Sequence, residues 1–165
     1  KFSSKLNLIR SLLHKVDKIL IGGHIVSTFV KAKLLNTSSS SSSSSIQEAY
    51  EILCIAKERN VEIILAHDFV CYQGTIDDAI RAKNEHGNID LYTLTNPKDD
   101  EMNYAFDIGE STIEVFRANL VDANTIIFNG PLGVFELDEF FNGTKKIIET
   151  IMREKPITYF CSLWW

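Results

Sequence analysis

Apolar residues recur at helical spacing in the first part of the chain. Four of them fall on one face of a predicted N-terminal helix: Leu6, Ile9, Leu13 and Val16. A short apolar run at residues 18–21 follows and ends at Gly22-Gly23, which predicts a buried strand closed by a glycine turn. Ile25, Phe29 and Val30 then predict a second helix that begins directly after the turn.

The alternation of helix and strand continues to the end of the chain. An apolar face at residues 49–56 predicts a third helix with Asn60 as its C-cap, and Ser111-Thr112-Ile113-Glu114 has the spacing of a capping box at the start of another. Apolar or β-branched runs predict strands at 61–65, 104–108, 125–128 and 157–160, with a last helix around 147–151. Five strands alternating with helices predict an α/β fold with a doubly wound, mostly parallel, Rossmann-like sheet that has helices on both faces.

Two stretches interrupt this alternation. The eight serines at 38–45 cannot bury apolar surface, so we expect a flexible, low-complexity surface loop there. Residues 73–100 are polar and rich in turn-forming residues, apart from a short apolar run at 89–94. We expect this second stretch to be an excursion from the sheet that holds one small hairpin.

Composition narrows the class of protein. The 165 residues suit one domain, and 45% apolar with 24% charged residues is the balance of a soluble globular chain. The net charge is −5 and Lys and Arg form no basic stripe, so we exclude nucleic acid as a partner. No apolar run approaches the ~20 residues that span a membrane, and no signal peptide is recognisable, so we expect a cytoplasmic location. Cys54, Cys71 and Cys161 lack metal-ligand spacing, which favours buried free thiols over a metal site.

Candidate chemistry gathers at two predicted strand ends, which is where α/β sheets bind ligands. Gly22-Gly23 would expose backbone N–H groups at a helix start, a common anion site, although such a turn is more often purely structural. The loop at 129–136 combines the amide of Asn129, a rigid turn at Pro131, an apolar platform and the carboxylate of Glu136. These groups suit the phosphate, base and ribose of a nucleotide, and a plain connection between strand and helix explains them equally well.

The loop Asn-Gly-Pro-Leu-Gly-Val-Phe-Glu at 129–136 resembles the signature loop in the nucleotide-binding C-terminal half of the phosphoglycerate kinases. The resemblance extends to residues 1–33, which match the family's lysine-bearing helix, strand and glycine turn. It also covers shorter motifs at 61–70, 104–109 and 140–144. Residues 1–165 therefore resemble part of one nucleotide-binding domain.

The resemblance implies a phosphotransferase that moves a phosphoryl group between 1,3-bisphosphoglycerate and MgADP, giving 3-phosphoglycerate and ATP in glycolysis. Lys5 falls on the catalytic lysine that holds the transferring phosphoryl group, and Lys1 lies one helical turn before it. Asp68 and Asp107 also match, and we interpret both as structural acids at strand ends. The implied nucleotide-binding residues are Gly22, Gly23, His24, Phe106, Asn129, Pro131, Val134 and Glu136.

The sequence departs from the family pattern at several of these positions. His24 replaces a small residue at the adenine wall, where its ring could stack on the base or block it, and Phe106 replaces a leucine. Ala66 and His67 replace a proline and its neighbour, and we do not interpret His67 as a metal ligand or a general base. The serine tract replaces a turn near the nucleotide, so a weakened nucleotide affinity is expected.

The 165 residues resemble a middle part of the family's sequence pattern. The family's N-terminal half, with its arginine-rich site for phosphoglycerate, has no counterpart in these 165 residues, and neither has its Gly-Gly-Gly-Asp loop for nucleotide phosphates and Mg2+. We therefore expect an enzyme fragment that is inactive by itself, with Trp164 and Trp165 as exposed apolar groups. A non-catalytic nucleotide-binding module and a degenerate remnant are the alternatives, and titration with ADP would separate them.

Overall fold

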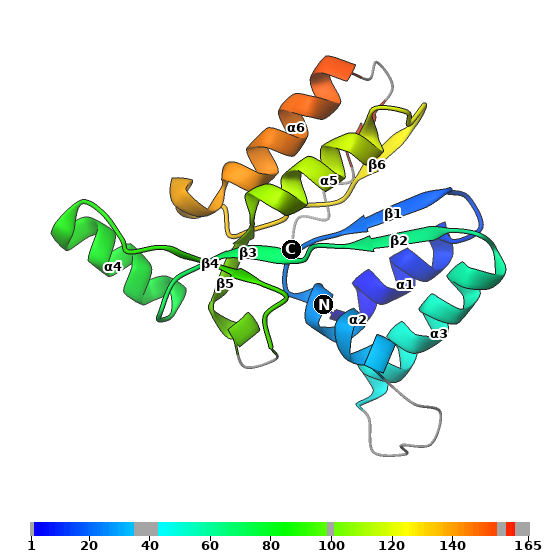
Figure 1. The fold of residues 1–165 in the computed structure, drawn as a ribbon, viewed down its shortest axis with the longest axis horizontal. Coiled ribbons are helices and arrows are strands. Elements are labelled where there is room, and N and C mark those ends of the chain that lie inside the picture. Colours follow the sequence, from blue (N-terminus) through cyan, green and yellow to red (C-terminus); the bar gives the residue numbers. More distant parts are fainter. Residues whose placement is uncertain (1, 35–42, 99–100, 155–157, 161–165) are drawn as a thin grey trace. The chain divides into compact units, whose positions relative to one another are not determined.

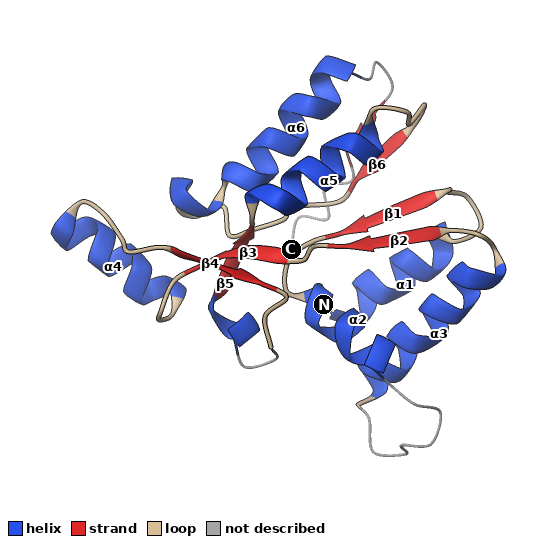
Figure 2. Ribbon diagram, viewed as in Figure 1, coloured by secondary structure: helices blue, strands red, loops and turns tan. Residues whose placement is uncertain are grey.

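The computed structural model describes residues 2–34, 43–98, 101–154 and 158–160 of the 165-residue chain. The chain folds into two compact units, Lys1–Leu65 and Ala66–Trp165. Both units contain helices and strands, so the predicted α/β class is confirmed (Figure 2). None of the helices in the described ranges is both long and apolar enough to cross a membrane.

The first unit is built from helices packed on a pair of strands. In chain order its elements are α1 (Phe2–Leu12), β1 (Lys18–Ile21), α2 (Ile25–Leu34), α3 (Ser44–Glu58) and β2 (Glu62–Leu65). The two strands run parallel, with Lys18 opposite Glu62 and Ile21 opposite Leu65. The helices of this unit lie together on one side of the strand pair, where α3 packs against both α1 and α2 (Figure 1).

The helical spacing of apolar residues produces the core of the first unit. An ion pair between Arg10 Nη2 and Glu51 Oε2, at 2.6 Å, joins α1 to α3. Exposed pairs of this kind contribute at most about 1 kcal/mol, so hydrophobic burial is the main stabilising force. Large apolar side chains from the three helices are almost fully buried, among them Leu6, Phe29 and Ile52, and Leu13 directly after α1 is buried with them.

Both ends of α3 differ from the prediction by one or two residues. The helix begins at Ser44, directly after the N-cap Ser43, so the last serines of the predicted loop are helical. Residues 38–42 of that loop lie outside the described residues. At the other end the C-cap is Arg59, and Asn60 follows it in the left-handed conformation with φ of 55°. Asparagine tolerates this conformation better than most residues, which explains how the helix stops here.

The second unit combines an antiparallel sheet with a parallel strand pair. The strand β3 is the centre of the antiparallel sheet, which has the order β4-β3-β5, while β6 pairs with β7 in parallel. The helices α5 and α6 lie side by side (Figure 1). In chain order the elements are β3 (Asp68–Cys71), α4 (Ile76–His86), β4 (Tyr92–Thr95), the 3-10 helix η1 (Glu101–Tyr104), β5 (Ala105–Ile108), α5 (Glu110–Leu120), β6 (Ile126–Phe128), the 3-10 helix η2 (Asp138–Phe140), α6 (Asn142–Glu154) and β7 (Thr158–Phe160).

The described strands include parallel pairs, as the fold prediction expects, and also antiparallel pairs that it did not include. They form two parallel pairs and a separate antiparallel sheet of three strands. A parallel neighbour requires a crossover of roughly a dozen residues, whereas only residues 66 and 67 separate β2 from β3. The strand β3 pairs antiparallel with β4 and β5 instead.

Residues 73–100 form more regular structure than predicted, because α4 lies within them. The helix begins at a capping box in which the Thr75 hydroxyl accepts from the Asp78 N–H at 3.2 Å and Asp78 Oδ2 accepts from the Thr75 N–H at 3.0 Å. It ends at Gly87, which has a φ of 75°. The predicted hairpin inside this stretch is also wrong, because β4 pairs with β3.

Phe106 of β5 and Phe140 of η2 form the centre of the core in the second unit. Their ring centroids are 5.0 Å apart and their planes are tilted by 38°. Ala79 of α4 packs with them, and all three side chains are buried. The cluster therefore ties α4 and β5 to the segment that follows β6. Partly buried apolar residues surround it: Val70, Tyr72, Ile76, Ile89, Val134 and Leu137.

The predicted free thiols are found where the structure describes them. Cys71 is free and buried as predicted, while Cys54 is free but exposed. Cys161, Trp164 and Trp165 lie outside the described residues, so their predicted surroundings are untested. In the described part of the chain, His, Cys, Asp and Glu side chains do not gather in groups of three or more that could hold a metal ion.

Candidate functional site

The loop at residues 129–136 leaves β6 and is held by hydrogen bonds from its own backbone. The Leu132 N–H donates to Thr144 Oγ1 of α6 at 2.9 Å. The Val134 N–H donates to the Phe106 carbonyl oxygen of β5 at 2.7 Å. Two nearby loop residues are thus fastened to two different elements, which gives this irregular segment a defined position.

Gly133 lies between those two anchor points, where no larger residue fits. A Cβ atom at this position would lie 2.4 Å from Asp107 Oδ1, 2.6 Å from the Phe140 carbonyl oxygen and 2.7 Å from the Phe106 carbonyl oxygen. Two of these three neighbours are backbone atoms that cannot rotate away. The glycine in the Asn-Gly-Pro-Leu-Gly sequence is therefore required by the close approach of the loop to β5 and η2.

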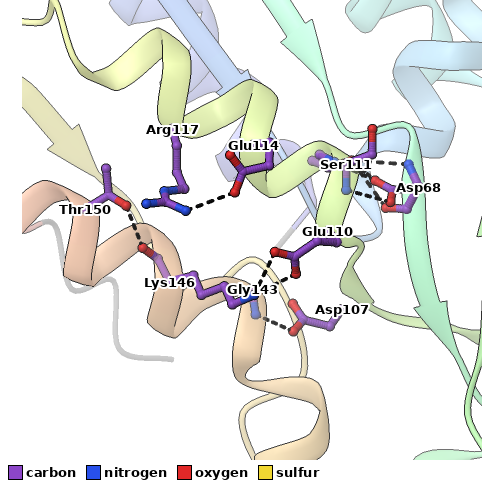
Figure 3. Close-up of polar contacts among 10 residues, drawn as sticks. Asp68, Asp107, Glu110, Ser111, Glu114, Arg117, Gly143, Lys146 and Thr150 are labelled. Atoms are coloured by element: carbon purple, nitrogen blue, oxygen red, sulfur yellow. Dashed lines mark hydrogen bonds and ion pairs between the residues drawn. The ribbon is translucent and has the colours of Figure 1, made fainter.

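Asp107 is the buried carboxylate beneath this loop. Its side chain lies at the start of α6, where Oδ2 accepts from the Gly143 N–H at 2.7 Å (Figure 3). The other oxygen, Oδ1, accepts from the Ile108 N–H at 2.9 Å. Only 2% of the residue is exposed. Burial raises the pKa of Asp107 to about 7, while the hydrogen bonds from Gly143 and Ile108 act in the opposite direction.

Asp68 plays the corresponding part for α5. Its carboxylate accepts from the Ser111 N–H at 3.0 Å and the Thr112 N–H at 2.7 Å (Figure 3). The predicted capping box of Ser111 and Glu114 is wrong, because the N-cap is Gly109, which has no side chain, and Asp68 supplies the acceptor from β3. The Ser111 hydroxyl is paired with His67 Nε2 at 2.9 Å instead. Both acids thus hold helix starts, in keeping with their interpretation as structural residues.

The side chains of the loop divide into exposed polar ends and a packed centre. Val134 packs against the cluster of Phe106 and Phe140, whereas Asn129 is half-buried and Glu136 is exposed. Within the described part of the chain, the Glu136 carboxylate has no hydrogen-bond or ion-pair partner. Pro131 is exposed as well. The structure therefore brings the predicted residues of this loop together with Phe106, and it leaves Glu136 free to accept hydrogen bonds.

The predicted residues of the first unit meet at the end of β1. Gly23 has a φ of 72°, which favours glycine, and its carbonyl oxygen accepts from the Val26 N–H at 3.1 Å in the first turn of α2. His24 follows, and its pKa is lowered, first by desolvation and second by the positive charge of Lys5. The exposed Lys5 therefore lies near this turn. Lys1 lies outside the described residues.

Comparison with known proteins decides which family has this arrangement. The family model described as phosphoglycerate kinase matches residues 1–162. The chain belongs to the phosphoglycerate kinase family. The phosphoglycerate kinase of Pseudothermotoga lettingae is 40% identical over 161 residues, which are 96% of this chain and 38% of that protein. That of Thermosipho africanus is 41% identical over 93% of this chain and 36% of its own length.

Solved structures agree with this assignment. The phosphoglycerate kinase of Coxiella burnetii has a TM-score of 0.75 at 26% identity, covering 97% of this chain and 39% of that one. The phosphoglycerate kinase of Pyrococcus horikoshii, with a TM-score of 0.66 at 23% identity, shares the fold. This chain thus spans less than two fifths of the length of the phosphoglycerate kinases named here.

The structure also shows residues that sequence reasoning did not assign to the site. Gly133 and Thr144 hold the loop and Gly143 holds Asp107 beneath it, although none was predicted to have this part. All three lie in motifs that were visible in the sequence, at 129–136 and 140–144. The signal was therefore present, but only the packing of the loop on α6 shows what these residues do.

Proposed function

We propose that this chain supplies the nucleotide side of the phosphoglycerate kinase reaction, in which a phosphoryl group passes between 1,3-bisphosphoglycerate and ADP to give 3-phosphoglycerate and ATP. The observation that carries the proposal is the exposed Glu136 carboxylate at the end of a loop anchored to β5 and α6. A carboxylate that has no partner among the described residues, on a loop held by its backbone, is suited to accept hydrogen bonds from the two hydroxyls of a ribose.

The rest of the loop fits the remaining parts of a nucleotide. Pro131 offers an exposed apolar ring for an adenine. Val134 packs against Phe106 and so supports the loop from the core of the unit. The Asn129 amide carries two N–H donors, which suit a phosphate oxygen. We assign adenine packing to Pro131 and Val134, phosphate contact to Asn129, and ribose binding to Glu136, while the buried Phe106 backs Val134 from the core.

The first unit contributes a cation and a glycine turn. We assign Lys5 to the transferring phosphoryl group, because phosphoryl transfer is catalysed mainly by positioning and by positive charge around the phosphoryl oxygens. Gly22 and Gly23 let the backbone approach the adenine closely, with Gly23 in a conformation that side chains disfavour. The lowered pKa of His24 favours the neutral form of its ring.

Phosphoglycerate kinases use ADP or ATP together with Mg2+. The described residues contain no acidic or histidine cluster suited to the metal, so we assign no Mg2+ ligand and no phosphoglycerate ligand to them. A Mg2+ ion bound with the nucleotide would neutralise phosphate charge. In this proposal the chain's own residues bind the nucleoside and position Lys5 at the phosphoryl group.

Isothermal titration of the 165-residue chain with ADP tests the proposal. We expect binding that weakens about tenfold or more in Glu136→Ala, because hydrogen bonds to a charged group contribute about 1.5–3 kcal/mol. Lys5→Ala should change the affinity much less, since its contact forms with the phosphoryl group in transfer. Glu149→Ala, an exposed glutamate on α6 away from the loop, is the matched control.

Two results would contradict this assignment. Absence of ADP binding by the unmodified chain would remove the nucleotide role. Loss of binding in Lys5→Ala with full binding in Glu136→Ala would reverse the parts given to the two residues.

A further inference from the structure

We propose that Asp107 is a positioning residue that fixes the loop at residues 131–136, and with it the place of the Glu136 carboxylate. The inference deepens the proposed nucleotide role of this loop and rests on it. Asp107 itself has no surface to offer a ligand, because only 2% of it is exposed. Its action on the loop runs through two routes, one direct and one through α6.

The direct route is the contact with Gly133. A Cβ atom at Gly133 would lie only 2.4 Å from Asp107 Oδ1, so the backbone of the loop rests against the carboxylate. The preceding residue on β5, Phe106, accepts from the Val134 N–H at 2.7 Å. Two adjacent residues of β5 therefore hold two adjacent residues of the loop.

The indirect route runs through the start of α6. Asp107 Oδ2 accepts from the Gly143 N–H at 2.7 Å, which satisfies one of the amides that a helix leaves unpaired at its N-terminus. The next residue, Thr144, accepts from the Leu132 N–H at 2.9 Å through its hydroxyl. Movement of the first turn of α6 would therefore carry the hydrogen bond to Leu132 with it.

Together the two routes fix three consecutive residues of the loop, Leu132, Gly133 and Val134, and Glu136 follows two residues later. With so short a segment in between, the placement of the Glu136 carboxylate depends on the placement of Val134. A carboxylate suits this task because its two oxygens accept from two different amides, Gly143 and Ile108. An amide side chain has one acceptor oxygen and would turn its NH2 group toward one of these donors.

Asp68 provides a control within the same unit. It is buried to a similar degree, at 4% exposed, and it also accepts from amides at a helix start. The described partners of its carboxylate, Ser111 and Thr112, lie in α5, and they do not include the loop at 131–136. A variant of Asp68 therefore removes a buried helix-capping acid without touching the route to Glu136.

The experiment compares Asp107→Asn with Asp68→Asn in the full 165-residue chain. Amide hydrogen exchange is followed in peptides that cover the loop and the first turn of α5, and ADP affinity is measured by titration. At pH 8, above the Asp107 pKa of about 7, the carboxylate is charged, and we expect Asp107→Asn to speed exchange of the Leu132 and Val134 amides and to weaken ADP binding, each about tenfold, as loss of a hydrogen bond to a charged group implies. Asp68→Asn should speed exchange in α5 and leave both the loop and ADP affinity unchanged.

Thr144→Val keeps Asp107 and removes only the acceptor of the Leu132 N–H, so it tests the indirect route if Asp107→Asn does not fold. Faster exchange at Leu132 in this variant supports the proposal. Unchanged loop exchange in every folded variant of Asp107 and Thr144 overturns it, as does an equal loss of ADP affinity in Asp68→Asn. Should the unmodified chain bind no ADP, the proposed function fails, and loop exchange alone still decides whether Asp107 positions the loop.

Discussion

Thr112 donates both its backbone N–H and its hydroxyl to Asp68 Oδ1, at 2.7 Å and 2.5 Å, across a separation of 44 residues. The Ser111 N–H donates to the other oxygen of the same carboxylate at 3.0 Å. The first N–H groups of a helix have no partner within the helix, and the positive end of the helix dipole lies there. A carboxylate from β3 thus satisfies the start of α5 and places a negative charge where it is stabilising.

The first prediction concerns this tertiary cap. Asp68→Ala should lower the free energy of unfolding by about 3 kcal/mol, because it leaves buried donors of Ser111 and Thr112 without an acceptor. Thr75→Ala, which removes the local cap of α4, should cost only about 1 kcal/mol. Urea denaturation followed by circular dichroism measures both.

Glu114→Gln is the control for the same helix. Among the described residues this side chain makes just an exposed ion pair, with Arg117 at 2.9 Å, so its loss should cost less than about 0.5 kcal/mol. A cost for Glu114→Gln as large as that for Asp68→Ala would show that α5 is capped locally after all.

The second prediction concerns the pH dependence of stability. The pKa of Asp107 in the folded chain is raised from 3.8 to about 7. Its contribution to stability is therefore fully present below about pH 4 and is lost as the pH rises through about 7. Relative to Asp107→Asn, which does not titrate, the unmodified chain should lose up to about 4 kcal/mol of stability over this range, as a shift of about three pKa units implies.

Urea denaturation of both proteins at several pH values between 4 and 8 checks this expectation. The quantity of interest is the difference between the two free energies of unfolding, because other titrating groups cancel in it. If that difference is the same at pH 4.5 and pH 8, the carboxylate of Asp107 titrates near its ordinary value and burial does not disfavour its charge.

The third prediction concerns Lys5 and His24. Desolvation is the larger cause of the lowered His24 pKa and the charge of Lys5 is the smaller one. Lys5→Gln should therefore raise the pKa of His24 toward its ordinary value of 6.5 without restoring it fully. Titration of the histidine ring protons by NMR measures the shift, with Lys15→Gln, an exposed lysine after α1, as the control.

Lys5 and His24 also determine how the stability of the folded chain changes with pH. Because the folded pKa of His24 is lowered, its contribution to stability is present above pH 6.5 and is lost as the pH falls through the folded pKa. Lys5→Gln should make this loss smaller. An unchanged His24 pKa in Lys5→Gln would place the lysine too far from the turn to act on it.

Local elements of this protein follow from local sequence. The strand β1 has the predicted bounds 18–21, and α2 begins directly after the predicted glycine turn. Here the spacing of apolar residues and the conformational freedom of Gly23 act within a few residues, so the local sequence is enough to determine the element. The loop at 129–136 belongs to this class too, since its motif already indicated the family that the comparison then showed.

Tertiary structure alone decided the partners of these elements. The pairing of β3 with β4 and β5, the cap that Asp68 gives α5, and the hold of Asp107 on Gly143 all join residues 21 to 44 positions apart. Spacing rules describe which face of an element is apolar, and they contain no information on which distant donor will face a given carboxylate. That choice depends on how the strands are placed when the cluster of Phe106 and Phe140 is buried, because hydrophobic burial is non-directional and the hydrogen bonds take their partners from the packing that results.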